Sequence, residues 1–166
     1  RADILIANKI GLAAFNSLSS LCMSVLAERD PMPEFYNVTE AFLDKISIQK
    51  NWEFFYLEWE LKLLSCIGFG LDLEKCAVTG TTENLCYISP KSGKAVCKDI
   101  GVKYHSKLLQ FPSIFSSVNC DQSFSKTDLV TGLNLTGFFI EKWLKFSIEN
   151  KKTLAIRKRL IHYLSA

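Results

Sequence analysis

The stretch NWEFFYLEWELKLLSCIG, residues 51–68, places aromatic and apolar residues along one face of an α-helix. These residues follow the i, i+3, i+4, i+7 rule and are Trp52, Phe55, Tyr56, Trp59, Leu63 and Cys66. Gly68 is a natural helix stop. The segment therefore predicts a helix that ends near Gly68 and packs its aromatic face inside a helical fold.

Four further stretches show helical spacing. The first covers about Lys9 to Ala27, and the second runs from Pro33 to near Ser47 with Phe35, Val38, Phe42 and Ile46 on one face. A third begins at Ser125, which is followed by Asp128 in a capping pattern, and reaches about Asn150. Its expected buried face is Leu129, Leu133, Thr136, Ile140 and Trp143. The last begins near Thr153 and turns Ile156, Leu160 and Tyr163 inward.

The stretch IGLAAFNSLSSLCMSVLA, residues 10–27, is also typical of a secretory signal peptide. Polar residues interrupt it, however, and its apolar residues recur at helical spacing, so we predict an amphipathic helix of a soluble protein. No other segment approaches the roughly 20 apolar residues of a membrane span, and we expect no membrane partner.

The stretch CAVTGTTENLCYISPKSGKAVC, residues 76–97, has the outer spacing of a zinc ribbon but only half of its ligands. A structural zinc site requires two close cysteine pairs, whereas Thr79 and Ile100 stand at the partner positions. LCYIS and KAVC are typical of short strands, and PKSG between them of a turn. With only eight Gly and four Pro, the chain is predicted to be mainly α: one helical domain over residues 1–166, with a zinc-ribbon-like β-ribbon inserted at about 76–100.

Three cysteines of the ribbon are candidate metal ligands: Cys76, Cys86 and Cys97. Zinc prefers four ligands in closed structural sites, and Asp99 and His105 are candidates for the fourth. We therefore expect no cofactor and a metal-free ribbon held by side-chain packing. The six cysteines of the chain are scattered, which favours a reducing, cytoplasmic setting over a secreted disulfide protein.

No catalytic motif is present in the sequence. His105 and His162 are its two histidines, and a Cys97–His105 nucleophile–base pair lacks a third member. We predict that the chain is not an enzyme.

Charge is distributed unevenly along the chain. Residues 1–60 carry five Lys and Arg against nine Asp and Glu, whereas residues 61–166 carry fifteen against eight. Such asymmetry is typical either of a phosphate-binding surface or of a solvated basic face. The candidate nucleic-acid-binding residues are Lys91, Lys94, Lys98, Lys103 and Lys107 around the ribbon, and Arg157, Lys158 and Arg159 near the C-terminus. Tyr87 and Tyr104 are candidates to stack on bases.

Several motifs resemble the RecO family of bacterial recombination mediators. WELKLLSCIGFGLDLEKCAVTG (residues 59–80) and YISPKSGKAVC (residues 87–97) are similar to the family's helix, cysteine knuckle and S-P-[RK]-x-G turn. LTGFFIEKWL (residues 135–144) resembles its closing helix, and LAERDPMPEFYNVTEAFLDKI (residues 26–46) its early helical pair. The resemblance covers most of the chain, but the family's zinc ligands match only at Cys76 and Cys97.

This resemblance implies an N-terminal OB-fold followed by a helical domain with a zinc finger, of which this sequence looks like the second part only. It further implies a protein of the bacterial cytoplasm and nucleoid that binds single- and double-stranded DNA and anneals complementary strands. Such a protein helps to load the recombinase on DNA coated by single-strand DNA-binding protein. The implied protein partners are RecR and the acidic C-terminal tail of the coating protein. An alternative is a protein-interaction module that binds an acidic tail and makes no DNA contact of its own.

Overall fold

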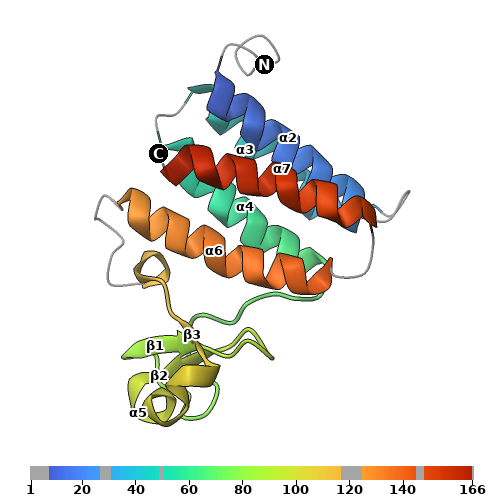
Figure 1. The fold of residues 1–166 in the computed structure, drawn as a ribbon. Helices are drawn as coiled ribbons and strands as arrows, with labels where there is room; N and C mark the ends of the chain where they lie inside the picture. Colours follow the sequence, from blue (N-terminus) through green and yellow to red (C-terminus); the bar gives the residue numbers. More distant parts are fainter. Residues whose placement is uncertain (1–7, 27–30, 49–50, 117–124, 145–147, 166) are drawn as a thin grey trace.

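The computed structural model describes residues 8–26, 31–48, 51–116, 125–144 and 148–165. Its five long helices are α2 (Lys9–Val25), α3 (Pro33–Ile48), α4 (Trp52–Cys66), α6 (Lys126–Trp143) and α7 (Ile148–Ser165). Figure 1 shows these helices stacked into a bundle, with a small sheet below α6. Helix α4 contacts α3 and α6, and α7 contacts α2 and α6. The mainly helical prediction is confirmed.

Helix α4 supplies the largest buried side chains of the bundle. Trp59 and Tyr56 are fully buried and stack at 5.8 Å between ring centroids, and the Trp59 indole N–H donates to the Thr39 hydroxyl at 2.9 Å. Phe35 and Phe42 of α3 pack against the same rings. Cys66 was expected on this face, but it is exposed at the last residue of α4.

The helix ends follow local capping chemistry. The Asn8 side chain accepts from the N–H groups of Ile10 and Gly11, at 3.1 and 3.2 Å, and so starts α2. At the start of α6, Ser125 and Asp128 form the predicted capping box. Capping by a side chain satisfies N–H groups that have no partner within the helix.

The boundary between α6 and α7 differs from the prediction. Helix α6 ends at Trp143 and α7 begins at Ile148, whereas the sequence suggested a continuous helix to about Asn150. Asn150 lies in the first turn of α7, and its side-chain amide donates to the Leu144 carbonyl at 2.9 Å. This bond satisfies a carbonyl at the end of α6 and helps to fix the corner between the two helices.

The ribbon is a three-stranded antiparallel sheet with strand order β2-β1-β3. Strands β1 (Leu85–Ile88) and β2 (Ala95–Cys97) were predicted, whereas β3 (Leu109–Gln110) was not. The short helix α5 (Lys98–Gly101) follows β2, and the 3-10 helix η1 (Val102–Lys107) comes between α5 and β3. Strand β3 pairs through Leu109 with Ile88 and through Gln110 with Tyr87.

The ribbon packs directly on the helical bundle. Ile88 is fully buried and belongs to the same hydrophobic core as α4 and α6, and Leu71, Leu109 and Phe111 pack against that core. The ammonium of Lys142 on α6 donates to the Pro90 carbonyl at 2.9 Å. The 3-10 helix η2 (Ser113–Phe115) contacts α6. In the described part of the chain, no helix is both long and apolar enough to cross a membrane.

Candidate nucleic-acid interface

The lysines of the ribbon all lie at its surface. Lys91 is in the turn between β1 and β2, and Lys94 immediately precedes β2. The remaining three follow β2, on α5 and η1: Lys98, Lys103 and Lys107. All five are exposed, so their ammonium groups are available to a polyanion.

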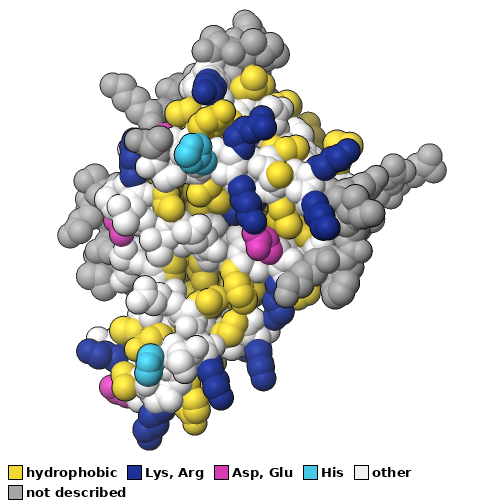
Figure 2. Space-filling model, in the orientation of Figure 1, with side chains coloured by type: hydrophobic (Ala, Val, Ile, Leu, Met, Phe, Trp, Pro, Cys, Tyr) yellow, Lys and Arg dark blue, Asp and Glu magenta, His cyan; other side chains and the backbone are white. Residues whose placement is uncertain are grey.

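A second group of basic residues lies on α7. Lys158 and Arg159 are exposed, and Lys158 forms an ion pair with Glu141 of α6 at 3.2 Å. Arg159 borders a groove between α2 and α7 together with Lys9, whose ammonium lies 4.6 Å from the Tyr163 ring centroid. Figure 2 shows Lys and Arg side chains over both the α7 region and the ribbon on one face of the molecule.

Arg157 is a correction to the candidate set. Its side chain points into the bundle, where it is only 3 % exposed, and it cannot contact a ligand at the surface. It donates to both carboxylate oxygens of Glu60, at 2.7 Å each, and to the Leu133 carbonyl at 2.6 Å. The buried row of α7 is Thr153, Arg157, Leu160 and Leu164, so the inward face predicted from Ile156, Leu160 and Tyr163 is rotated.

Electrostatics keep the buried Arg157 charged. Burial lowers the pKa of the guanidinium, but the charge and hydrogen bonds of Glu60 outweigh this effect and raise the pKa above its ordinary value. The Thr136 hydroxyl donates to the same carboxylate. Glu60 and Arg157 are therefore structural groups that join α4 to α7.

The aromatic candidates differ in accessibility. Tyr104 is 56 % exposed, so its side chain is accessible to a ligand at the surface. Tyr87 packs against a small buried cluster of Cys76, Val96 and Cys97, called the ribbon cluster below. Its ring also lies so close to Gly101 that a Cβ atom on that residue would clash with it. Phe69, which was not among the residues expected from the sequence, is 40 % exposed just after α4. The sequence signal that could have identified this residue is an aromatic side chain between two glycines, GFG at residues 68–70.

Cys76 and Cys97 lie next to each other in the ribbon. The Cys97 N–H donates to the Cys76 sulfur at 3.3 Å, and the Thr79 hydroxyl lies 3.7 Å from the Cys97 sulfur. Burial raises the pKa of the Cys76 thiol. Hydrogen bonds from the Thr79 hydroxyl and from backbone N–H groups outweigh burial and lower that pKa to about 6.

The residues do not fit a four-ligand zinc site. The partner positions hold Thr79 and the partly buried Ile100, which packs with the ribbon cluster. Among the described residues, no group of three or more His, Cys, Asp or Glu is placed to hold a metal. Cys86 lies on β1 between Leu85 and Tyr87, which pack against that cluster, and it borders a different groove that includes Glu83. Strand alternation separates Cys86 from the other two thiols.

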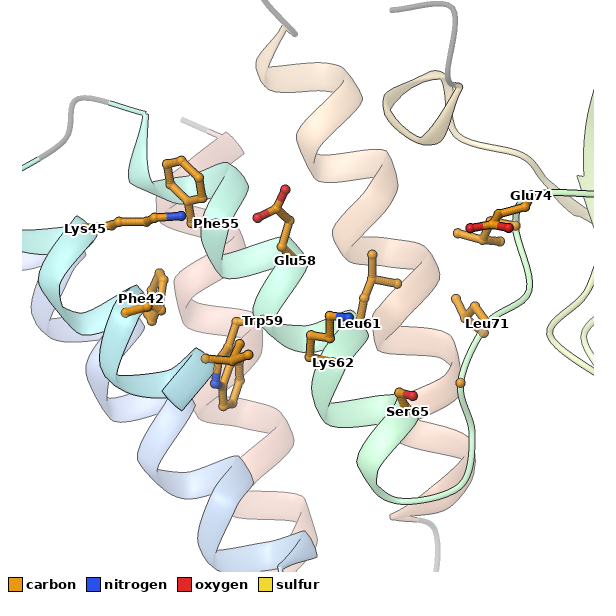
Figure 3. A pocket seen from close by; sticks show the side chains of 14 residues that line it. Phe42, Lys45, Phe55, Glu58, Trp59, Leu61, Lys62, Ser65, Leu71 and Glu74 are labelled. Atoms are coloured by element: carbon orange, nitrogen blue, oxygen red, sulfur yellow. The ribbon is translucent and has the colours of Figure 1, made fainter. Parts of the chain in front are cut away.

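A groove of about 620 Å³ lies between α3, α4 and the segment that leaves α4 (Figure 3). The partly buried Leu71 and Leu73 supply apolar surface, and Lys45 and Lys62 border it. The Lys45 ammonium lies 3.6 Å from the Phe55 ring centroid, a cation–π contact that fixes the side chain. The other charged residues of the lining are Glu58 and Glu74. This groove suits an apolar peptide side chain better than a nucleotide.

Fold and site define a mainly helical module that carries a small, lysine-bearing β-ribbon. A family model described as "Recombination protein O C terminal" matches residues 10–152. The chain belongs to the RecO family, as the resemblance of its motifs had indicated.

Curated relatives carry the name "DNA repair protein RecO". The protein of Ehrlichia chaffeensis is 39 % identical over 155 residues, which cover 87 % of this chain and 62 % of the relative. That of Wolbachia pipientis wMel is 42 % identical over 139 residues, covering 81 % and 58 %. The protein of Ruegeria sp. (strain TM1040) is 33 % identical over 165 residues, which cover 99 % of this chain and 67 % of the relative. The chain thus spans about three fifths of the length of the first two relatives. No solved structure matches it.

Proposed function

We propose that this chain is the helical and ribbon part of a non-enzymatic DNA repair protein of bacteria, and that it contacts DNA through the ribbon. The observation that carries the proposal is the exposure of all five ribbon lysines on a rigidly packed ribbon. The relatives' name, "DNA repair protein RecO", supports a role in DNA repair. In this role Lys158 and Arg159 extend the contact along α7, whereas Arg157 does not take part.

Lysines that neutralise phosphates bind without regard to sequence and release counterions as they do so. Such contacts suit a protein that anneals complementary strands and helps to load a recombinase on DNA coated by single-strand DNA-binding protein. We include these activities in the proposal. The proposed partners are single-stranded DNA, double-stranded DNA and RecR, and the proposed location is the bacterial nucleoid.

The second candidate function is binding of an acidic partner tail, such as that of single-strand DNA-binding protein. The observation that favours it is the groove between α3 and α4, where Lys45 and Lys62 flank apolar surface (Figure 3). A carboxylate next to an apolar side chain would find both a cation and a hydrophobic wall there. Glu58 and Glu74 in the same groove weaken the attraction.

Charge reversal separates the two candidates. We expect Lys91→Glu/Lys94→Glu to weaken binding of a labelled oligonucleotide about tenfold or more at low salt, and to reduce the slope of log K against log salt by about 2 for duplex. The matched control is Lys45→Glu/Lys62→Glu, which changes net charge equally but should impair only an acidic peptide. Unchanged oligonucleotide binding by the ribbon variant would remove the ribbon from the DNA site.

A further inference from the structure

A second, smaller cavity lies where the ribbon meets the bundle, with a volume of about 230 Å³. It is bounded by the end of α4, the turn between β1 and β2, and the last turns of α6. Two ammonium groups border it, from Lys91 and Lys142, and the described lining contains no carboxylate. The lining is completed by Gly68, Phe69, Gly70, Ser92, Gly93 and Phe139. Its charge is therefore complementary to an anion.

Lys142 is held in place for this role. Its ammonium donates to the Pro90 carbonyl at 2.9 Å, and its side chain is partly buried. An ammonium has three N–H donors, so the bond to Pro90 leaves further donors free for an anion. Because the position is already fixed by the protein, less side-chain entropy is lost on binding than for a fully mobile surface lysine.

Glycine backbone allows a close approach at the rim. Gly68 has a φ of +83°, and a Cβ atom built on it would meet nothing within 4 Å, so open space lies beside it. Gly93 in the turn has a φ of +69°, a conformation that other residues rarely adopt, but it is buried and a Cβ atom there would lie 2.8 Å from the Leu71 side chain. An anion can thus approach the backbone at Gly68 without meeting a side chain at that position.

Phe69 provides a flat apolar surface at the same rim. Its ring is 40 % exposed and packs edge-on against Trp143, at 6.4 Å between centroids and 80° between planes. The edge contact orients the ring and leaves part of it open to solvent. A base placed on such a ring gains stacking energy whatever its identity, because every base has a π-face.

We infer that this junction is a binding subsite for single-stranded nucleic acid, in which one backbone phosphate lies between Lys91 and Lys142 and a neighbouring base stacks on Phe69. The inference rests on the proposed DNA-binding function and adds to it a preference of this subsite for single-stranded over double-stranded nucleic acid. An anion next to an exposed aromatic ring matches a nucleotide, and a base is free to stack on a side chain only when it is unpaired. Neither Phe69 nor Lys142 was among the residues expected from the sequence.

Two substitutions test the subsite. Phe69→Ala removes the stacking ring, and Lys142→Gln removes the charge while keeping a donor for the Pro90 carbonyl. The probes are a fluorescein-labelled oligothymidylate of about 15 nucleotides, within the range that one small binding domain covers, and a duplex of the same length. Tyr36→Ala, which removes a 63 % exposed ring on α3, is the matched control.

We expect Phe69→Ala to weaken binding of the oligothymidylate about tenfold and to leave duplex binding within about twofold. Lys142→Gln should reduce the salt slope for the oligothymidylate by about 0.7. Oligothymidylate should also quench the fluorescence of Trp143, and the Trp143→Phe variant should lose that quenching. Equal thermal midpoints of the variants and the parent chain would show that folding is intact.

Equal effects of Phe69→Ala on both probes, or none, would overturn the inference. So would an unchanged salt slope in Lys142→Gln, or an acidic peptide that displaces oligothymidylate from the parent chain but not from Phe69→Ala. If Lys91→Glu/Lys94→Glu weakens binding while both new variants bind normally, the subsite fails and the proposed function stands. If the parent chain binds neither probe at low salt, both fail.

Discussion

The guanidinium of Arg157 on α7 and the carboxylate of Glu60 on α4 form a two-bond ion pair inside the bundle, at 2.7 Å for each bond. The two residues are 97 positions apart in the chain and are 3 % and 0 % exposed. The pair therefore fixes the position of α7 relative to α4. A buried pair of this kind offsets its own desolvation only while both partners are present.

Removal of one partner should consequently be costly. We expect Arg157→Met to lower the free energy of unfolding by about 3–5 kcal/mol, because it leaves a buried carboxylate without its partner. Urea unfolding at neutral pH measures this difference. The double variant Glu60→Leu/Arg157→Met should lose less than Arg157→Met alone, and a double variant that is less stable than either single one would contradict this account.

Helices α6 and α7 approach closely at Gly137. A Cβ atom there would lie 2.5 Å from a guanidinium nitrogen of Arg157, so Gly137→Ala should destabilise the protein although alanine favours a helix. The control is Gly11→Ala in α2, where the nearest atoms would lie at an ordinary 3.5 Å. This control should be neutral or stabilising by up to about 1 kcal/mol. The thermal midpoint should therefore fall for Gly137→Ala and stay equal or rise for Gly11→Ala, and a midpoint of Gly137→Ala that does not fall would refute the close contact.

Trp59 is the largest fully buried side chain of α4. It is fully buried, its indole N–H is bonded to Thr39, and it packs on Phe35. We expect Trp59→Ala to cost about 3–5 kcal/mol in the free energy of unfolding. Tyr36→Ala, at an exposed position of α3, should change it by less than about 0.5 kcal/mol. An unchanged denaturation midpoint for Trp59→Ala would show that the aromatic face is wrongly placed.

The sequence was sufficient for features that depend on local spacing. The aromatic face of α4 apart from Cys66, the capping box at Ser125 and the two strands around the PKSG turn were predicted correctly, because each is encoded within a few residues. Strand β3 was missed, since only two residues pair and their partner lies more than twenty residues earlier. Tertiary pairing decided its structure.

The candidate site was predictable only in part. Exposure of the ribbon lysines follows from a polar turn and a short helix, whereas the burial of Arg157 depends on Glu60, which is distant in the sequence. A basic run such as RKR gives no sign of which member faces a buried carboxylate. Lys142 could not be chosen from sequence either, because its role depends on the Pro90 carbonyl, 52 positions away.

The Asp128 carboxylate gives the start of α6 a dependence on pH. Hydrogen bonds from the hydroxyls of Ser113 and Ser125 and from the Ser125 N–H lower its pKa below the ordinary value of 3.8. A lowered pKa contributes stability that is present above the ordinary value and is lost as the pH falls through the lowered one. Asp128→Asn should therefore be less stable than the parent at pH 6, and the difference should shrink below about pH 4. Thermal midpoints across this range measure it, and a difference independent of pH would contradict the assignment.

The ribbon should accept zinc once its missing ligands are supplied. Thr79 and Ile100 stand where a second member of each cysteine pair is needed, and the Cys76 sulfur already accepts backbone N–H bonds that favour a thiolate, the form that binds metal. We expect Thr79→Cys/Ile100→Cys to retain about one equivalent of zinc through gel filtration, and its thermal midpoint to fall on addition of a chelator. The parent chain should retain much less, and its midpoint should not respond.

Thr79→Ser/Ile100→Val, which restores no thiol, is the matched control. One equivalent of zinc in the parent chain would show that its two knuckle cysteines already suffice with other ligands, and no zinc in the four-cysteine variant would show that the ribbon has lost the knuckle geometry.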